Sequence, residues 1–240
     1  TLQRLESVPS LAAFEALLQR PGPWLGAFDL PFGLPRELVE SLGWPRDWAA
    51  LMRHYAALSR PEIRATFAAF CAARPVGGKF AHRVCDGPAG SSPSMKWVNP
   101  PVAFMLHAGV PRLLAAGLHL PGLHAGDTQR VAVEAYPGLL ARELIGRRSY
   151  KSDDRARQTA ERLIARKDLV DALEQGRSQL RLRLRLTHAQ RDALVADAMG
   201  DRLDALLCLV QGAWAAGQAN HGMPADVDPL EGWIATAGVT

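Results

Sequence analysis

Two short apolar runs, each ending in a carboxylate, constrain the fold of this chain more than any other feature. The run from Trp24 to Leu30 is interrupted by a single charge, Asp29, and the run from Arg130 to Tyr136 contains Val131-Ala132-Val133 followed by Glu134. Continuous apolar runs of this length are typical of parallel strands that are buried on both faces. Because helical patterns separate the two runs, we predict an α/β fold with a partly parallel sheet flanked by helices.

The remaining elements follow from apolar spacing and from the positions of proline and glycine. Leu2 to Val8 and the alternating residues 179–186 suggest strands, 232–235 suggests a terminal strand or turn, and residues 75–101 suggest a long loop. Helices are expected from Ser10 onward and at about 35–43, 45–58, 61–73, 101–118, 137–145, 152–175 and 188–217. We expect one domain over 1–240, with a helical and loop insertion at about 35–128 and C-terminal helices at about 188–217.

Length and composition fit a single globular domain. The 240 residues are 48% hydrophobic, and no apolar run is long enough to cross a bilayer. The first residues lack the basic and apolar regions of a secretory signal, so we expect a cytoplasmic protein with no membrane partner. The 3 cysteines have no C-x-x-C spacing, which gives no support for a disulfide framework or a cysteine zinc site.

Arginine dominates the basic residues. The net charge is +4, and only Lys79, Lys96, Lys151 and Lys167 are lysines among the 28 basic side chains. Arginine is suited to bidentate phosphate contacts, although a GC-rich genome would enrich it as well. Arg181, Arg183 and Arg185 alternate with leucines. This row has two interpretations: it binds phosphates, or it is the outer face of an amphipathic edge strand.

Four carboxylates occupy positions that an ordinary core would not favour. Asp29 and Glu134 stand at strand ends, and Asp201 and Asp204 are three residues apart on an otherwise apolar helix, which places them on one helical face. Buried carboxylates need cations, and ligand sets made only of oxygen favour Mg²⁺ or Mn²⁺. A simpler reading stays open, in which Asp29 is a turn or cap residue and Asp201 forms a surface ion pair with Arg202 or Lys167.

Three segments together resemble a known family. Phe28-Asp29-Leu30-Pro31-Phe32-Gly33-Leu34-Pro35, Val133-Glu134-Ala135-Tyr136-Pro137 and Gly200-Asp201-Arg202-Leu203-Asp204-Ala205-Leu206 are similar to the signatures of a bacterial and archaeal domain family of unknown function. That family is described as predicted nucleases of ribonuclease H-like fold. The resemblance therefore implies a ribonuclease H-like mixed sheet flanked by helices.

The resemblance also implies an activity, which is hydrolysis of a phosphodiester with two divalent ions, Mg²⁺ or Mn²⁺. It assigns Asp29, Glu134, Asp201 and Asp204 as metal ligands and catalytic residues. Phosphate contacts would come from Lys96, Arg147, Arg148 and Lys151. The alternative is a non-catalytic nucleic-acid- or nucleotide-binding domain of the same fold. Neither the substrate (DNA, RNA or a small phosphoester) nor the oligomeric state follows from the sequence.

One departure from the family pattern concerns the start of the chain. A ribonuclease H-like sheet begins with an antiparallel three-strand meander, whose first strand donates an aspartate to the metal site. Here the chain opens on what resembles the third strand, Leu2 to Val8. We therefore expect that two strands and one ligand are missing and that the natural protein begins upstream.

Overall fold

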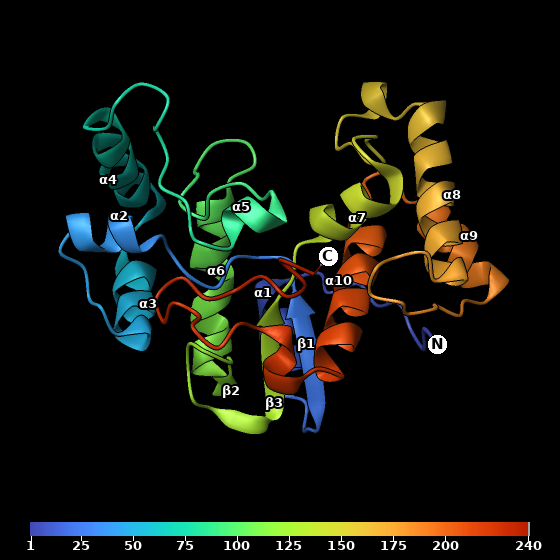
Figure 1. Cartoon of the computed structure of the whole chain (residues 1–240), viewed down its shortest axis with the longest axis horizontal. Coiled ribbons are helices and arrows are strands. Elements are labelled where there is room, and N and C mark those ends of the chain that lie inside the picture. The colour runs from blue at the N-terminus through green and yellow to red at the C-terminus, as the bar shows by residue number, and fades with distance from the viewer. Residues whose placement is uncertain (240) are drawn as a thin grey trace.

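A small parallel sheet forms the centre of the computed structural model, which describes residues 1–239. Its three strands, in the order β1-β3-β2, are β1 (Trp24–Phe28), β3 (Asp127–Glu134) and β2 (Leu118–His119). Helices lie on both sides of the sheet (Figure 1). The prediction of an α/β fold with parallel strands at the two apolar runs is confirmed.

The register of β1 and β3 determines where the polar groups gather. Phe28 lies opposite Glu134 in the parallel ladder, and the Ala135 amide donates a hydrogen bond of 2.9 Å to the Phe28 carbonyl. Since Asp29 directly follows Phe28, Asp29 and Glu134 leave the sheet at the same edge. Ligand sites of open parallel sheets form at this carboxyl edge.

Helices make up most of the remaining structure. They are α1 (Leu11–Leu18), α2 (Arg36–Ser41), α3 (Trp48–Ala57), α4 (Arg60–Ala72), α5 (Asp86–Ala89), α6 (Val102–Ala115), α7 (Pro137–Ile145), η1 (Arg155–Arg157), α8 (Ala160–Gln175), α9 (His188–Ala196), α10 (Asp201–Ala216) and η2 (Ala219–Gly222). The expected helix over 152–175 starts only at Ala160. The Asp154 side chain accepts a hydrogen bond from the Ala156 amide and so stabilises a separate 3-10 turn before it.

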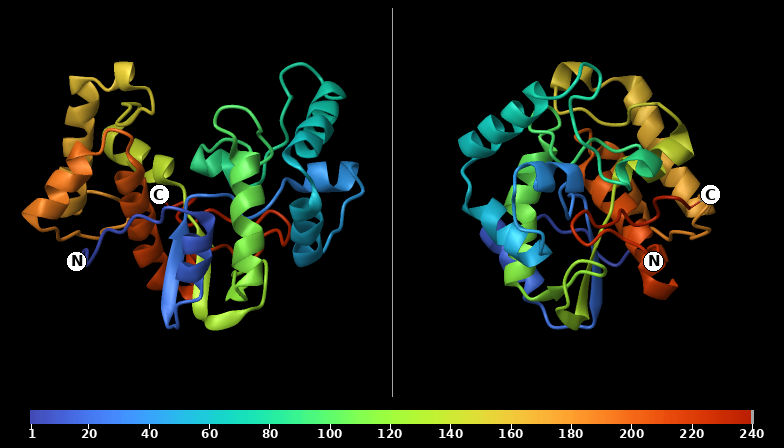
Figure 2. Two further views of the ribbon diagram at one scale, coloured as in Figure 1. Left: turned by 180° about the vertical axis from the view of Figure 1, so that it is seen from behind. Right: turned by 60° about the vertical axis from the view of Figure 1, so that its left-hand side comes forward.

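The two faces of the sheet have different partners. Leu25, Ala27, Val131 and Val133 pack against α10, whereas Phe28 contacts Phe14 of α1 with ring centroids 6.0 Å apart on the opposite face. A large apolar cluster on one side of the sheet involves α2, α3, α4 and α6, and a second cluster on the other side involves α7, α8, α9 and α10. The back and side views show these two helical groups flanking the sheet (Figure 2).

Two strand predictions near the N-terminus need correction. Residues 1–9 have no regular secondary structure and do not pair with β1. Leu2 is instead buried against the α7–α10 cluster, and its amide donates to the Arg185 carbonyl. The residues of β1 are all half-buried rather than buried on both faces, because β1 is at the edge of the sheet and β3 is its only strand neighbour among residues 1–239.

The alternating segment 179–186 also differs from the prediction, since it forms no strand. The period of two is nevertheless visible in the burial: Leu180 is buried and the following leucines are half-buried, while Arg181, Arg183 and Arg185 are exposed. Arg181 has a φ of 54°, which interrupts the extended backbone. The leucines therefore pack one by one against the α7–α10 cluster without a ladder of hydrogen bonds.

The C-terminal segment returns to the sheet. Ile234 forms an isolated parallel bridge with Glu134, and the Ala235 amide donates to the Glu134 carbonyl at 2.8 Å. This agrees with the expected strand or turn at 232–235 and covers the carboxyl end of β3. Within residues 1–239, no helix is both long enough and apolar enough to pass through a membrane.

Close packing of α10 on β1 yields a first prediction. A Cβ atom added at Gly212 would lie 2.8 Å from the Ala27 Cβ, which is fixed to the strand backbone. Overpacking of this kind costs about 1–3 kcal/mol, more than the ~1 kcal/mol that alanine gains over glycine in a helix. We expect Gly212→Ala to lower the free energy of unfolding, measured by urea denaturation.

The matched control is Gly87→Ala in α5, where an added Cβ meets no atom within 4 Å. This variant should unfold at the wild-type urea concentration or slightly above it. Equal stability of the two variants would contradict the close α10–β1 contact.

Candidate functional site

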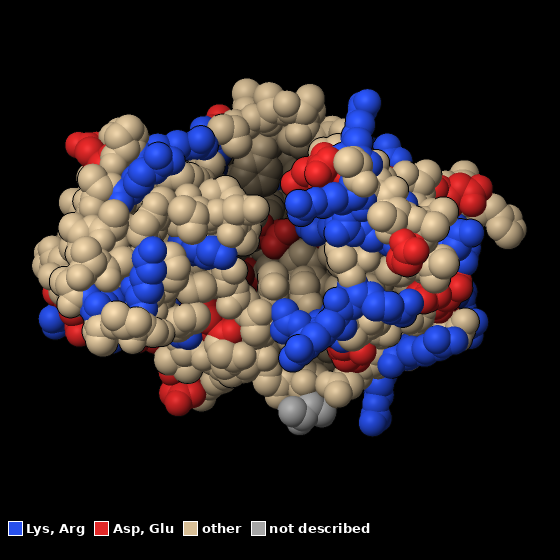
Figure 3. Space-filling view, turned by 90° about the horizontal axis from the view of Figure 1, so that it is seen from above, with Lys and Arg blue, Asp and Glu red and all other residues tan. Residues whose placement is uncertain are grey.

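A cavity of about 440 Å³ opens at the carboxyl edge of β1 and β3, and we call it the cleft. Asp29 follows β1, Glu134 ends β3, and Arg148 and Lys151 come from the segment after α7. Viewed from above, the molecule is hollowed between its two helical groups, with an acidic side chain visible inside the hollow and Lys and Arg side chains gathered on one side of it (Figure 3). Apolar residues form another part of the wall, namely Leu30, Pro31, Val102 and Met105.

Asp29 is the carboxylate of the cleft that lacks a neutralising partner. Its side chain reaches solvent, but it makes no hydrogen bond that shifts its ionisation. Enclosure by the surrounding protein raises the pKa of Asp29 to about 7; the negative charges of Asp204 and Glu134 act in the same direction, and Lys151 opposes them. Because loss of hydration is the largest cause, the raised pKa marks Asp29 as a carboxylate whose charge is poorly compensated by its surroundings.

Asp204 supplies the neighbouring carboxylate from the first turn of α10. It is 7% exposed, and its Oδ1 accepts a 2.5 Å hydrogen bond from the Tyr150 hydroxyl while its Oδ2 pairs with the Lys151 ammonium. Burial raises the pKa of Asp204, and Lys151 and Tyr150 oppose this rise. Burial also acts to lower the pKa of Lys151, but Asp204, Asp29 and Asp201 together raise it.

Gly200 makes this pairing possible. It precedes α10 with a φ of +85°, a conformation that favours glycine, and a Cβ atom there would lie 2.6 Å from the Lys151 Cβ. The glycine in the Gly200-Asp201-Arg202-Leu203-Asp204 segment therefore lets residue 151 approach the start of α10 closely.

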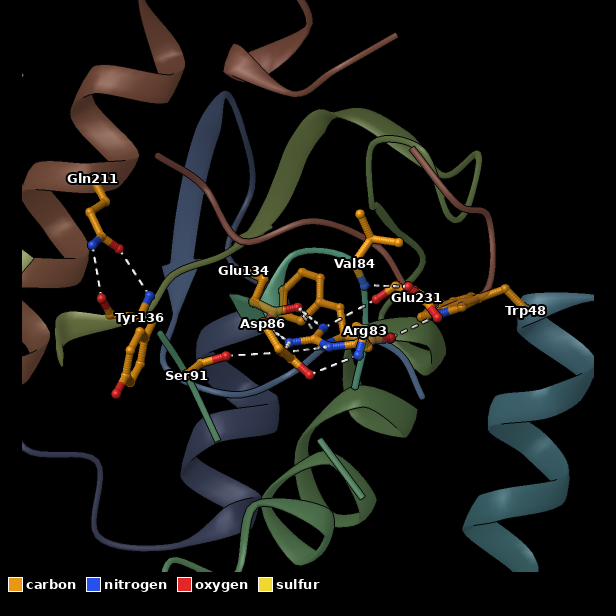
Figure 4. A network of polar contacts seen from close by, with 10 residues as sticks. Trp48, Arg83, Val84, Asp86, Ser91, Glu134, Tyr136, Gln211 and Glu231 are labelled. Carbon is orange, nitrogen blue, oxygen red and sulfur yellow. Dashed lines mark hydrogen bonds and ion pairs between the residues drawn. The ribbon is translucent and has the colours of Figure 1, made fainter. Parts of the chain in front are cut away.

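Glu134 has a different environment from Asp29, because a buried arginine neutralises it. Both Arg83 terminal nitrogens donate to the Glu134 carboxylate at 2.7 Å, and the Phe32 amide donates to Glu134 Oε2 at 2.8 Å (Figure 4). Arg83 also binds Asp86, and Ser91 donates to Asp86 at 2.9 Å. Burial raises the pKa of Glu134, and the guanidinium of Arg83 opposes that rise.

The network around Arg83 extends to the C-terminal segment. One Arg83 nitrogen donates to the Glu231 carbonyl at 3.1 Å, and the Glu231 carboxylate accepts hydrogen bonds of 2.7 Å from the amides of Val84 and Arg36. Four separate parts of the chain thus meet at one buried group of charges. The wall of the cleft formed by Arg83 and Glu134 is held in place by these contacts.

The other expected site residues are distributed unevenly. Asp201 is exposed on the first turn of α10, and its charge acts on Lys151 and Asp204. Arg148 and Lys151 line the cleft, and Arg148 also pairs with Asp168 at 2.6 Å. Arg147 is exposed and Lys96 is half-buried in the loop before α6, and neither belongs to the cleft wall.

Several residues of the site were not recognised from the sequence. Arg83, Asp86 and Glu231 are single charges in loops, and no spacing connects them with Glu134. Tyr150 lies in the basic stretch that the sequence singled out, but nothing there indicated a bond to Asp204. The one available signal was the short run Arg83-Val84-Cys85-Asp86, in which opposite charges three residues apart precede a glycine-rich loop.

The four expected carboxylates do not form one metal-binding group. Throughout the described chain, no set of three or more His, Cys, Asp or Glu side chains is arranged to hold a metal ion. Glu134 has its charge satisfied by Arg83, which leaves Asp29 and Asp204 as the two neighbouring carboxylates. Among residues 1–239, the cation that acts on both of them is the Lys151 ammonium.

Comparisons with known proteins add no further constraint. Neither models of protein families, nor curated protein sequences, nor solved structures gave a match to this chain. The assignment of function therefore depends on the geometry of the cleft.

The Arg83 network generates a stability prediction. Replacing Arg83 by Met would leave Glu134 and Asp86 buried without their countercharge, and breaking a buried ion pair in this way costs about 3–5 kcal/mol. We expect Arg83→Met to lower the free energy of unfolding by that amount in urea denaturation. Arg147→Met, at an exposed position, is the control and should change it little; a wild-type urea midpoint for Arg83→Met would contradict the structural role of Arg83.

The raised pKa of Asp29 leads to a prediction about how the stability of the protein depends on pH. Folding raises this pKa from its ordinary value of 3.8 to about 7, so the folded state binds more protons between these values and loses stability as the pH rises through them. In Asp29→Asn this loss is absent. We therefore expect Asp29→Asn to match the wild type at pH 3.5 and to gain stability relative to it up to about pH 7.

Urea denaturation at pH 3.5, 5.5 and 7.5 measures this difference. The exposed residue Asp192 on α9 provides the control, since Asp192→Asn should differ from the wild type by the same small amount at each pH. A constant difference for Asp29→Asn would show that Asp29 has an ordinary pKa.

Proposed function

We propose that the cleft is the active site of a cation-dependent phosphodiester hydrolase. The observation that carries the proposal is the uncompensated Asp29 carboxylate beside the Asp204–Lys151 pair, at the carboxyl edge of two parallel strands. Basic groups on the same cavity, Arg148 and Lys151, suit a phosphate ligand. The site thus combines a place for a cation with a place for an anion.

The fit of a metal ion can be judged from the donor set. Mg²⁺ is commonly held by one or two carboxylates together with substrate phosphate oxygens and water. Asp29 and Asp204 meet that requirement for one ion, and the Lys151 ammonium against Asp204 is a cation at the same place. Glu134 does not fit, because Arg83 takes both of its oxygens. We therefore propose one Mg²⁺ or Mn²⁺ on Asp29 and Asp204 in place of the expected pair of ions on four carboxylates.

The side chains of the cleft have distinct tasks in this proposal. Tyr150 holds Asp204 through its Oδ1, so that Oδ2 stays directed toward Lys151. The Lys151 side chain is 42% exposed, so its ammonium can turn from Asp204 to a phosphate oxygen, and Arg148 binds a second oxygen of the same group. When bound, the divalent ion would lower the pKa of a water molecule and neutralise charge on the phosphate. Asp29 must be ionised for this role, and a bound divalent ion would favour its ionised form.

We extend the proposal to the fold, which we take to be ribonuclease H-like. In its favour are the parallel β1–β3 pair with carboxylates at its carboxyl edge and the helix α10, which packs on β1 and carries Asp204. No antiparallel meander exists among residues 1–239, so the support is restricted to this half of the fold.

A non-catalytic domain that binds nucleic acid or nucleotides is the second candidate. It is favoured by the pairing of Glu134 with Arg83, which removes one of the four expected carboxylates from any cation site. Both candidates need the basic residues of the cleft, but only the hydrolase needs Asp29 and Asp204 as anions.

The test measures hydrolysis of bis(p-nitrophenyl) phosphate at pH 8 with millimolar Mn²⁺. Asp204→Asn keeps an acceptor for Tyr150 but removes the charge that holds the cation, so we expect kcat/KM to fall by roughly 100-fold or more. Asp29→Asn should have a similar effect.

Asp192→Asn is the matched control and should hydrolyse the ester at the wild-type rate. A wild-type protein that binds phosphate without hydrolysing the ester would reject the hydrolase and support the binding domain. Full activity of Asp204→Asn would reject the proposed site.

A further inference from the structure

A second hollow adjoins the cleft, and we call it the groove. It has a volume of about 470 Å³ and is lined by Arg148, Ser149, Arg157, Thr159, Glu161 and Arg162. Arg148 and Ser149 line the cleft as well, so the two hollows lie next to each other on either side of these residues. The groove therefore begins where a phosphate in the cleft would contact Arg148.

The groove is strongly basic, with three guanidinium groups and one carboxylate, Glu161. Arg157 is only loosely paired, since its Nε lies 3.4 Å from Asp154 and its side chain is 75% exposed. Arg162 donates to the backbone carbonyl of Arg157, and within residues 1–239 it forms no ion pair with a carboxylate. Exposed pairs of this kind contribute little free energy, so these guanidiniums are available to an anionic ligand.

From this adjacency we infer that the substrate is a single-stranded oligonucleotide, with one phosphodiester in the cleft and the next phosphate in the groove. The inference rests on the proposed function and names its substrate class. Successive phosphates of one strand need separate basic sites next to each other, and the cleft and groove provide two that share Arg148. A lone nucleotide would use only the first.

The size and chemistry of the cleft favour a single strand over a duplex. A cavity of about 440 Å³ is in the range of small-molecule sites, so it accommodates one nucleotide unit at a time. Its apolar wall, which includes Leu30, Val102 and Met105, offers a surface for the face of an unpaired base. A base in a duplex is stacked and paired and cannot reach that wall without leaving the helix.

Fluorescence anisotropy with labelled oligothymidylate of 10 residues tests the inference, at 4 °C with Mn²⁺ and with gel analysis to confirm that the oligonucleotide stays intact. The double variant Arg157→Gln, Arg162→Gln should bind on the order of tenfold more weakly at 0.1 M salt. The slope of log affinity against log salt should become shallower by about 0.7, because the groove holds one phosphate and each phosphate neutralised on a single strand contributes about 0.7.

The charge-matched control is the double variant Arg46→Gln, Arg53→Gln. Arg46 lies just before α3 and Arg53 lies within it; both are exposed, and neither lines the cleft or the groove. The control variant should keep the wild-type affinity and salt slope. Thymidine 5′-monophosphate should bind the wild type and the groove variant equally, since it is too short to reach the groove.

Two outcomes would overturn the inference: unchanged oligothymidylate affinity in the groove variant, or tighter binding of a duplex of the same length. Hydrolysis of bis(p-nitrophenyl) phosphate by the wild type separates the two proposals. Normal hydrolysis with unchanged oligonucleotide affinity rejects only the substrate class, whereas no hydrolysis rejects the proposed function and this inference with it.

Discussion

The buried ion pair between Arg83 and Glu134 is the interaction on which the rest of the site depends. It joins the loop before α5 to the end of β3, and the same guanidinium reaches Asp86 and the Glu231 carbonyl. An unpaired charge in this position would be very costly, so these segments must meet for the chain to fold. Arg83 and Glu134 also line the cleft, so the interactions that stabilise the fold fix the shape of this part of its wall.

Charge is distributed unequally between the two carboxylates at the sheet edge. Glu134 ends β3 and Asp29 directly follows β1, yet Glu134 has a bidentate arginine and Asp29 has none. In the proposed site this difference gives Glu134 a structural role and leaves Asp29 for the cation. The excess negative charge around Asp29 and Asp204, beside the arginines of the cleft and groove, is the arrangement expected where a cation and a phosphate bind together.

Some of this structure could be predicted from the sequence and some could not. The parallel strands and α7, whose observed bounds of Pro137–Ile145 match the expected ones, follow from local signals such as an apolar run, a proline at the first helical turn and a glycine at its end. The carboxylates at the strand ends were also recognisable. The partner of Glu134 was not, since Arg83 lies 51 residues away in an irregular loop. The alternating leucines of 179–186 also have the period of a strand, but no neighbouring strand exists in the described chain to accept the hydrogen bonds.

The central claim is that Asp29 and Asp204 hold a divalent cation while Glu134 stays with Arg83. A crystal structure determined after soaking in millimolar Mn²⁺ at pH 8, with anomalous diffraction data, tests it directly. The account predicts one anomalous peak in contact with both aspartates, Lys151 turned away from Asp204, and the Arg83–Glu134 pair unchanged. No peak at this position, or a peak bound by a Glu134 that has left Arg83, would contradict it.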